Sequence, residues 1–467
     1  MAMLLRTVFG KVKLMQRVPH RSNRNACFML SPPFAVLLIS TFLILSLRPE
    51  LSLFKSSVSA HDKWPNMTYK VSPVQQRNPK EDYGSHTVPF SSSSQLNSTT
   101  PQLASPPPSH IIKTMATSPY HNWELFYADY QEMLQKLKIF VYPMNNESSP
   151  FSGVFLPHPN PLNPKIGNYF SEHAFKLALL QSSLVTQRPE EAHFFFMPFS
   201  INAMRNYPLF HSESSIPNFV AHYILKISSE FQFWNVSAGA DHFFICCHSV
   251  GREATSKHFA LHNNAIQVTC SSSYFNRLYS AHKDIALPQV WPRHQDQVLN
   301  PPSARNKLVF FAGRVQNSPM RKEILRLWGN DTSFSMFSGH SSFPYEEGFK
   351  RSKYCLHIKG YDVNTARISD AIHYGCIPVV ISNYYDLPFA NILDWSKFSI
   401  VVHQSDIALL KHILISVTEQ MYQSLYQNLY TVRKHFSWHP EMPVSYDSFY
   451  MTVYQLWLRR GLHRLVA

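Results

Sequence analysis

Residues 352–382 hold the densest group of side chains that could bind an anion. A glycine-containing loop leads to Arg367, and a carboxylate, Asp370, follows three residues later. On a helix these two side chains would lie on the same side, one turn apart. Asn364 or Thr365 could cap that helix, whose first backbone N–H groups would then face an anion. An arginine for a pyrophosphate and a carboxylate for ribose hydroxyls would suit a nucleotide, although the same spacing also suits an ordinary surface ion pair.

A second group of positions could support the same anion. Gly313 and Arg314 follow a buried apolar run, where a glycine lets a phosphate approach and an arginine neutralises its charge. Arg314 could equally be a solvated loop cation. Arg321, just inside the next helical pattern, is a weaker candidate, and Lys359 could add a phosphate contact. The predicted donor-binding residues are Gly313, Arg314, Arg321, Lys359, Gly360, Arg367 and Asp370.

Titratable side chains also flank an apolar run near residue 245. Asp241 and His242 precede this run, and His248 follows it. In a strand, His248 would lie at the carboxyl end, where parallel sheets bind their ligands, and it could take a proton from an attacking hydroxyl group. Asp241 and His242 would lie at the other end, where they could simply hold the turn after Gly239. His248 and Asp241 are therefore the catalytic candidates, and the base stays unassigned.

These residues sit among apolar runs that are typical of buried strands. In the first half of the chain such runs lie near 138–142, 192–198, 241–248 and 265–269, with a helical pattern near 169–183. The runs are apolar throughout and do not alternate, as expected of strands that are covered on both faces.

A second series of elements follows. Its predicted strands lie at 307–313, 354–358, 376–381 and 398–402, and its helices at 319–328, 365–374, 406–436 and 446–460. Two successive series of alternating strands and helices predict an α/β protein with two doubly wound sheets that face a cleft. A dehydrogenase or a P-loop enzyme is not expected, because the chain has neither Gly-x-Gly-x-x-Gly nor a Walker Gly-Lys-Ser/Thr.

The N-terminal region predicts membrane attachment. Residues 27–47 form an apolar stretch near the length needed to cross a bilayer, and six basic residues precede it. This favours a signal anchor with a cytoplasmic N-terminus, with a cleaved signal peptide as the alternative. Residues 48–118 are rich in Ser, Pro, Asn and Thr and predict a disordered stem. Five Asn-x-Ser/Thr sequences would then be lumenal glycosylation sites: Asn66, Asn97, Asn146, Asn235 and Asn330.

Charge and cysteines set further limits. The net charge of +14 is partly concentrated in the N-terminal tail and otherwise spread thinly, so nucleic-acid binding is not expected. Cys27 lies in the apolar stretch, which leaves five lumenal cysteines, an odd number that implies at least one unpaired thiol. Adjacent Cys246 and Cys247 are first interpreted as buried strand residues. The cysteine spacing does not suggest a metal site, and the cleft segments contain no Asp-x-Asp.

Several segments, taken together and in order, resemble plant exostosin-like proteins of glycosyltransferase family 47. The resemblance covers about 120–459 and is strongest across 352–397. Other matching segments are Lys138–Tyr142, Ala192–Pro198, Trp234-Asn235, Gly239–Phe243, Lys283–Pro288, and Phe311–Arg314 with Arg321. The resemblance implies a GT-B fold of two Rossmann-like domains, an inverting mechanism without a metal, and a Golgi type II membrane protein. It also implies a nucleotide sugar, most often UDP-linked, as co-substrate and a cell-wall, matrix or glycoprotein glycan as acceptor.

Carried over position by position, Arg367 and Asp370 fall on the family's Arg-x-x-Glu-like motif. The shorter Asp370 stands where many members have Glu, and Ile358-Lys359-Gly360 stands where many have Pro-Ser-Gly. These departures keep open a second interpretation, a catalytically silent member that binds glycan or scaffolds a synthase complex. Under either interpretation, the chain could form homo- or hetero-oligomers with other Golgi transferases. The expected parts are a tail (1–26), anchor (27–47), stem (48–118), acceptor domain (119–304), nucleotide-sugar domain (305–437) and C-terminal helix (438–467).

Overall fold

The computed structural model describes residues 118–144, 151–155, 167–207, 209–210, 214–292, 298–316, 318–339 and 341–461. The predicted tail, anchor and nearly all of the stem lie outside these residues, as do Asn66, Asn97 and Asn146. In the described part of the chain, none of the helices has both the length and the apolar character needed to span a bilayer.

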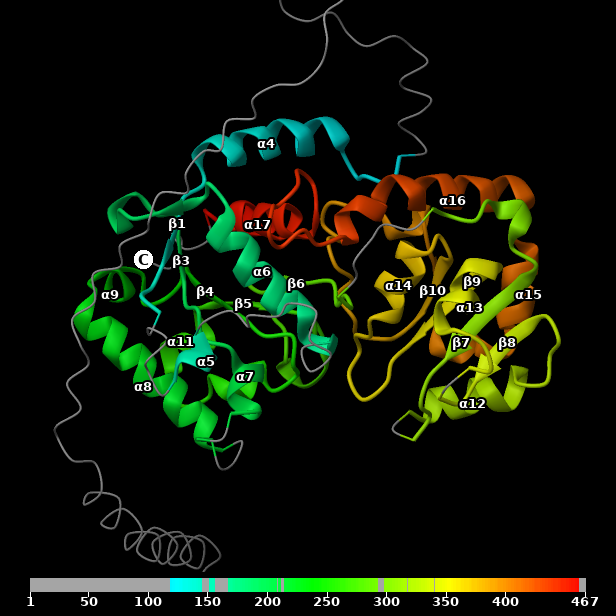
Figure 1. The fold of residues 1–467 in the computed structure, drawn as a ribbon, viewed down its shortest axis with the longest axis horizontal. Coiled ribbons are helices and arrows are strands. Elements are labelled where there is room, and N and C mark those ends of the chain that lie inside the picture. The colour runs from blue at the N-terminus through cyan, green and yellow to red at the C-terminus, as the bar shows by residue number, and fades with distance from the viewer. Residues whose placement is uncertain are drawn as a thin grey trace, which may run out of the picture. The chain divides into compact units, whose positions relative to one another are not determined.

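Six strands form the first sheet, all parallel, in the order β2-β1-β3-β4-β5-β6 (Figure 1). Their bounds are β1 Ile139–Val141, β2 Val185–Thr186, β3 Phe194–Phe196, β4 His242–Ile245, β5 Ile266–Thr269 and β6 Ile285–Ala286. Every residue of β3, β4 and β5 is buried, which accounts for the unbroken apolar runs in the sequence.

Helices connect these strands and cover the sheet. They are α4 Trp123–Lys136, α5 Ser152–Phe155, α6 Phe170–Gln181, α7 Ile201–Arg205, α8 Ser215–Glu230, α9 Phe233–Ser237, α10 Gly251–Ala254 and α11 Phe259–Asn263. Local sequence explains several of their starts: the side chains of Asn122, Ser200 and His258 accept hydrogen bonds from the first turns of α4, α7 and α11. The amphipathic α8 buries Ile216, Val220 and Ile224 along one face.

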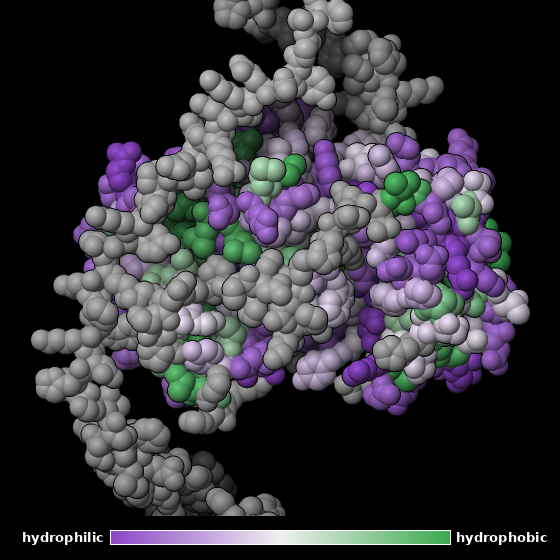
Figure 2. All heavy atoms as spheres, viewed as in Figure 1, coloured by the Kyte–Doolittle hydropathy of each residue, from purple (hydrophilic) through white to green (hydrophobic). Residues whose placement is uncertain are grey.

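The second sheet contains five parallel strands in the order β11-β10-β9-β7-β8. These are β7 Lys307–Ala312, β8 Phe334–Phe337, β9 Ser352–Ile358, β10 Ile377–Ile381 and β11 Ile400–Val401. Its helices are α12 Pro319–Trp328, α13 Tyr345–Arg351, α14 Arg367–His373, α15 Leu410–Ser416 and α16 Glu419–Val432. The predicted pair of parallel α/β sheets is thus confirmed. On the face seen in Figure 2, the described surface over this second sheet is mainly hydrophilic, with apolar residues in small separate groups.

The last helix, α17 Ser448–Leu458, returns to the first sheet and contacts α4, α6 and β6 (Figure 1). Its Trp457 indole donates a hydrogen bond to Asp129 of α4 at 2.9 Å, and the Tyr454 hydroxyl donates to the same carboxylate at 3.1 Å. Helix α17 therefore holds α4 and α6 against the first sheet.

A buried histidine joins the start and the end of the described chain. His435 is fully buried, with Nε2 2.8 Å from the Tyr120 hydroxyl and Nδ1 2.6 Å from the Tyr446 carbonyl oxygen. Burial lowers the pKa of His435 to about 3. The folded chain therefore holds this imidazole neutral at pH values where an unfolded chain would protonate it.

We predict that this histidine makes stability fall in acid. Between its unfolded pKa of about 6.5 and its folded pKa, the unfolded state binds one more proton, so stability decreases as pH falls, by up to about 1.4 kcal/mol per pH unit. In His435→Gln the loss of unfolding free energy between pH 7 and pH 5 should be smaller, as measured by urea denaturation. His412→Gln, at an exposed position in α15, should keep the native slope. An unchanged slope in His435→Gln would contradict the prediction.

Candidate functional site

Two arginines converge where β7 and β9 end. Arg367, the first residue of α14, donates from Nε to the carbonyl oxygen of Ala312 at 2.8 Å. Arg321, in the first turn of α12, donates to the carbonyl oxygen of Ile358 from Nε at 3.2 Å and from Nη2 at 2.8 Å. Both guanidinium carbons lie over the ring of Phe311, at 5.4 Å for Arg367 and 5.7 Å for Arg321. The carboxyl edge of the second sheet thus carries two positive charges side by side.

The electrostatics of this pair favour an anion. Arg321 is only 6% exposed, and burial lowers its pKa to about 10, with the nearby charge of Arg367 as the second cause. Backbone carbonyl oxygens and the Phe311 ring offset part of this cost but carry no negative charge. A phosphate placed against the half-exposed Arg367 would supply that charge and form charge-assisted hydrogen bonds with a guanidinium.

Two predicted glycines make room for the guanidinium groups. A Cβ atom at Gly313 would lie 2.5 Å from Nη2 of Arg367, and one at Gly360 would lie 2.9 Å from Nη2 of Arg321. Both separations are shorter than a van der Waals contact, so a larger residue would displace the arginines. The sequence thus places glycine at the two points where backbone and arginine approach most closely.

The remaining predicted donor residues lie around this pair at different depths. The side chain of Arg314 is exposed, and its carbonyl oxygen accepts a hydrogen bond from Arg321 at 2.9 Å. Lys359 is half-buried, and its carbonyl oxygen accepts from Ser318. Asp370 is only 3% exposed, so a surface ion pair with Arg367 is excluded. A role for Asp370 in binding ribose stays a prediction.

The predicted capping of α14 is wrong. Its N-cap residue is Ala366, and a side-chain cap is absent. Thr365 instead contacts Nδ1 of the buried His357 at 3.2 Å, and Asn364 points away from the helix. Burial, together with smaller contributions from the charges of Arg367 and Arg321, lowers the pKa of His357 to about 3, so this imidazole is neutral beside the arginine pair.

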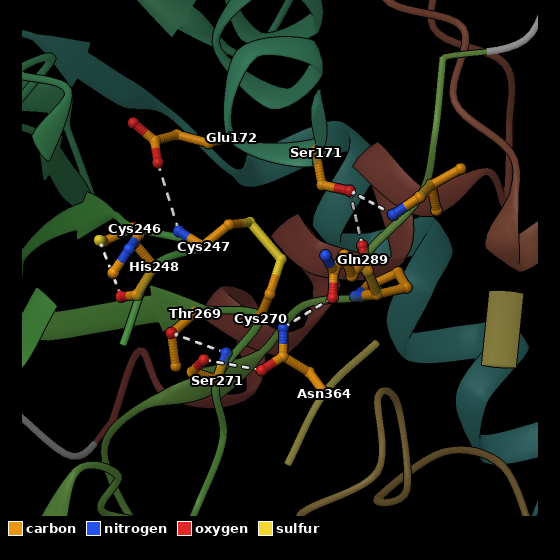
Figure 3. Close-up of a disulfide and its surroundings, with 12 residues drawn as sticks. Ser171, Glu172, Cys246, Cys247, His248, Thr269, Cys270, Ser271, Gln289 and Asn364 are labelled. Atoms are coloured by element: carbon orange, nitrogen blue, oxygen red, sulfur yellow. Dashed lines mark hydrogen bonds between the residues drawn. A yellow bond between two sulfur atoms is a disulfide. The ribbon is translucent and has the colours of Figure 1, made fainter. Parts of the chain in front are cut away.

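Asn364 instead joins the two sheets. Its carbonyl oxygen accepts from the Ser271 hydroxyl at 2.7 Å, and its amide donates to the Gln289 side chain at 2.8 Å. All three residues are buried, and they come from the loops after β5, β6 and β9. Figure 3 shows Asn364 between Ser271 and Gln289, close to a disulfide bond. We call these three residues the junction clamp.

The disulfides correct one interpretation of the cysteines. Cys247 is not simply an apolar strand residue, because it pairs with Cys270 and so ties the loop after β4 to the loop after β5. A second disulfide, Cys355–Cys376, joins β9 to the start of β10. Cys246 is buried and is the free thiol among the described residues, in line with the expectation of at least one unpaired cysteine.

The two predicted catalytic residues lie at opposite ends of β4. His248 follows the strand and stacks on Tyr169 with ring centroids 5.2 Å apart. Its Nε2 lies against the Arg205 guanidinium, and its Nδ1 accepts from the Val250 amide at 3.2 Å. A histidine placed between these donors is poorly suited to take a further proton. It can still position neighbouring groups.

Asp241 belongs to a buried network at the amino end of β4. Its carboxylate accepts from Ser237 and lies 2.6 Å from Nδ1 of His242, whose Nε2 is 2.7 Å from the Tyr142 hydroxyl. These contacts support the alternative interpretation, in which Asp241 and His242 hold the turn after Gly239. The structure does not bring Asp241 together with His248.

Asp362, which sequence reasoning missed, is the carboxylate that meets the His248 loop. It lies in the loop between β9 and α14, and its carboxylate accepts a hydrogen bond from Ser249. Burial raises the pKa of Asp362, and its charge also helps to raise the pKa of Tyr169, although burial is the larger cause there. Its position two residues after Gly360 was the available signal, but only packing shows which loop it meets.

Comparisons with known proteins agree with the resemblance noted in the sequence. The Exostosin GT47 domain model matches residues 133–417. A probable glycosyltransferase of Arabidopsis thaliana is 34% identical over 355 residues, which cover 73% of this chain but only 65% of that protein. A second is 32% identical, covering 73% and 71%. A probable glucuronoxylan glucuronosyltransferase of the same plant is 25% identical, covering 68% and 76%.

We predict that the junction clamp contributes measurably to stability. Asn364→Leu leaves the Ser271 hydroxyl and the Gln289 carbonyl oxygen buried with one partner fewer, which should cost about 1–3 kcal/mol for each group that is left unsatisfied. Urea denaturation should show this loss of unfolding free energy. Asn263→Leu, at an exposed position in α11, should change stability by less than about 0.5 kcal/mol. Equal effects of the two substitutions would show that the clamp contributes nothing.

Proposed function

The chain belongs to the exostosin GT47 family of glycosyltransferases, and on that premise we propose that it moves a sugar from a UDP-linked nucleotide sugar to a cell-wall, matrix or glycoprotein glycan. The observation that carries this proposal is the arginine pair at the carboxyl edge of the second sheet. That edge is where open parallel sheets bind nucleotides, and the pair presents fixed positive charge there. The kinship with probable plant glucuronosyltransferases supports a glycan as the acceptor.

The pair suits the leaving group of such a transfer. When the bond between the anomeric carbon and the phosphate oxygen breaks, negative charge grows on the diphosphate. Arg367 is half-exposed and can contact the diphosphate directly. Arg321 is buried and adds its positive charge to the electrostatic potential at the same place. Because carbonyl oxygens already hold both guanidinium groups, they need little reorganisation during the reaction. This preorganisation is what a transferase requires to expel a diphosphate.

We further propose Asp362 as the general base of an inverting displacement. The acceptor hydroxyl loses its proton to the Asp362 carboxylate as its oxygen bonds to the anomeric carbon, and the diphosphate leaves on the opposite face with the bonding electron pair. A raised pKa makes this carboxylate a better proton acceptor than an ordinary aspartate. Ser249 holds it in place, and His248, beside Ser249, positions the loop from the first sheet.

We also propose a Golgi lumenal location, with the apolar stretch 27–47 as the anchor. Asn235 in α9 and Asn330 after α12 are both exposed, so their side chains are accessible to glycan addition. This accessibility is compatible with the folded part of the chain lying in the Golgi lumen, where such sites are glycosylated.

The proposed transfer predicts a specific effect of Asp362. The full chain should release UDP from one member of a panel containing UDP-glucuronic acid, UDP-galactose, UDP-xylose and UDP-arabinose, supplied with plant oligosaccharides. Asp362→Asn should lower kcat by about 10²–10⁴-fold while thermal stabilisation by UDP persists, because the base is lost and the anion site is not. Asp362→Glu should recover part of the rate.

Glu190→Gln, at an exposed position far along the chain from the site, serves as the control and should keep the native rate. Unchanged turnover in Asp362→Asn would remove Asp362 from the mechanism. If the chain binds UDP but turns over none of these donors, the result would favour the second interpretation, a catalytically silent protein. In that case the shorter, buried Asp370 would not bind the donor as the usual glutamate would.

A further inference from the structure

Two exposed aromatic side chains from different sheets meet beside the junction clamp. Phe275 follows β5 and is 58% exposed, and Tyr384 follows β10 and is 61% exposed. Their ring centroids lie 6.1 Å apart with the ring planes inclined by 37°. We call Phe275 and Tyr384 the aromatic platform. Large aromatic rings usually bury most of their solvent-accessible surface on folding. Two such rings that contact each other and stay exposed to solvent therefore need an explanation.

The backbone holds the platform rigidly and at some cost. Tyr384 has φ of 62°, a left-handed conformation that a bulky residue rarely adopts. Its carbonyl oxygen accepts from the Tyr274 amide at 2.9 Å, Ser273 and Tyr385 form an isolated antiparallel bridge, and the Asp386 amide donates to the Ser272 carbonyl oxygen at 2.9 Å. These backbone contacts therefore fix the direction in which the Tyr384 side chain leaves the backbone.

A carboxylate beneath the platform adds to this rigidity. The side chain of Tyr274 interacts with the Asp386 carboxylate, and the Asp386 carbonyl oxygen accepts from the Ser272 hydroxyl at 2.6 Å. The Tyr279 hydroxyl donates to the Asp284 carbonyl oxygen at 3.2 Å. The two loops that carry the rings are thus joined by side chains as well as by backbone hydrogen bonds.

The platform is continuous with the candidate site. Tyr385, next to Tyr384, stacks on His357 at 5.5 Å, and His357 contacts Thr365, two residues before Arg367. On the other side, Ser271 of the clamp lies four residues before Phe275. Both rings follow the carboxyl ends of their strands, so they lie on the same edges of the two sheets as the proposed reaction.

We propose that the aromatic platform is a subsite for a pyranose ring of the acceptor glycan, an inference that rests on the proposed transferase function. A pyranose presents a face of C–H groups that packs on aromatic rings, and its hydroxyl groups require polar neighbours at the rim. Arg277 is exposed and Asn383 half-exposed beside the rings, which supplies such a rim.

This arrangement sets how the acceptor is held. One sugar unit stacks on a surface to which both sheets contribute, while another unit offers its hydroxyl group to Asp362. The platform therefore recognises a chain of at least two sugars and does not contact the nucleotide. Its loss should weaken glycan binding without affecting UDP.

The test measures glycan binding directly. Isothermal titration of the full chain with xylohexaose, cellohexaose and β-1,4-galactohexaose should reveal binding of at least one of them. Tyr384→Asn removes the ring but keeps a residue that tolerates the left-handed conformation, and it should weaken binding at least tenfold, as should Phe275→Ser. Tyr384→Phe should bind like the native chain. So should Phe259→Ala, which removes an exposed ring from α11.

Unchanged glycan affinity in both platform variants would overturn the subsite, as would a native chain that binds none of the three hexasaccharides. Self-association of the chain that both variants abolish would also overturn it, in favour of a protein interface. UDP-induced thermal stabilisation, measured on the same samples, separates this from the proposed function. If UDP still stabilises a chain with no glycan binding, only the platform fails, whereas loss of both responses contradicts the transferase as well.

Discussion

Two like charges held in one place constrain much of this structure. Arg321 and Arg367 share the ring of Phe311 and the carbonyl oxygens at the ends of β7 and β9. Burying a guanidinium next to another is unfavourable, so the fold needs glycine at two close approaches and a neutral histidine alongside. The arrangement is understandable if an anion completes it, and we propose that this anion is the diphosphate of a nucleotide sugar.

The candidate site also depends on the contact between the two sheets. The junction clamp is made entirely of uncharged polar groups, each of which is buried and hydrogen-bonded to another. Such a contact is favourable only when all partners meet in one geometry. It therefore fixes the loop that carries Asp362 relative to the loop after β5, and the Cys247–Cys270 disulfide ties that loop to the one that carries His248. The aromatic platform lies further along the same two edges, so the proposed donor, base and acceptor positions share one junction.

The sequence predicts the elements better than the contacts between them. Strands such as β3 and β10 were predictable because they are apolar on both faces, whereas β8, an edge strand containing Ser335, carries no such run. Arg367 and Gly313 were found because charge and glycine mark phosphate sites. Asn364 was misassigned as a cap because capping is a local rule, and its real partners lie 75 and 93 residues away. Asp362 was missed for the same reason. Arg321, the weaker candidate in the sequence, is buried and hydrogen-bonded to backbone carbonyl oxygens, whereas the Arg314 side chain is exposed.

The central claim is that the arginine pair binds the diphosphate of a nucleotide sugar, and thermal unfolding of the full chain with UDP tests it most directly. At about 100 times its dissociation constant, UDP should stabilise the native chain by about 2.7 kcal/mol. Arg326→Ala, an exposed arginine on the same helix as Arg321, should keep this stabilisation, and Arg367→Ala should lose it. Equal stabilisation of Arg367→Ala, or no stabilisation of the native chain, would contradict the account.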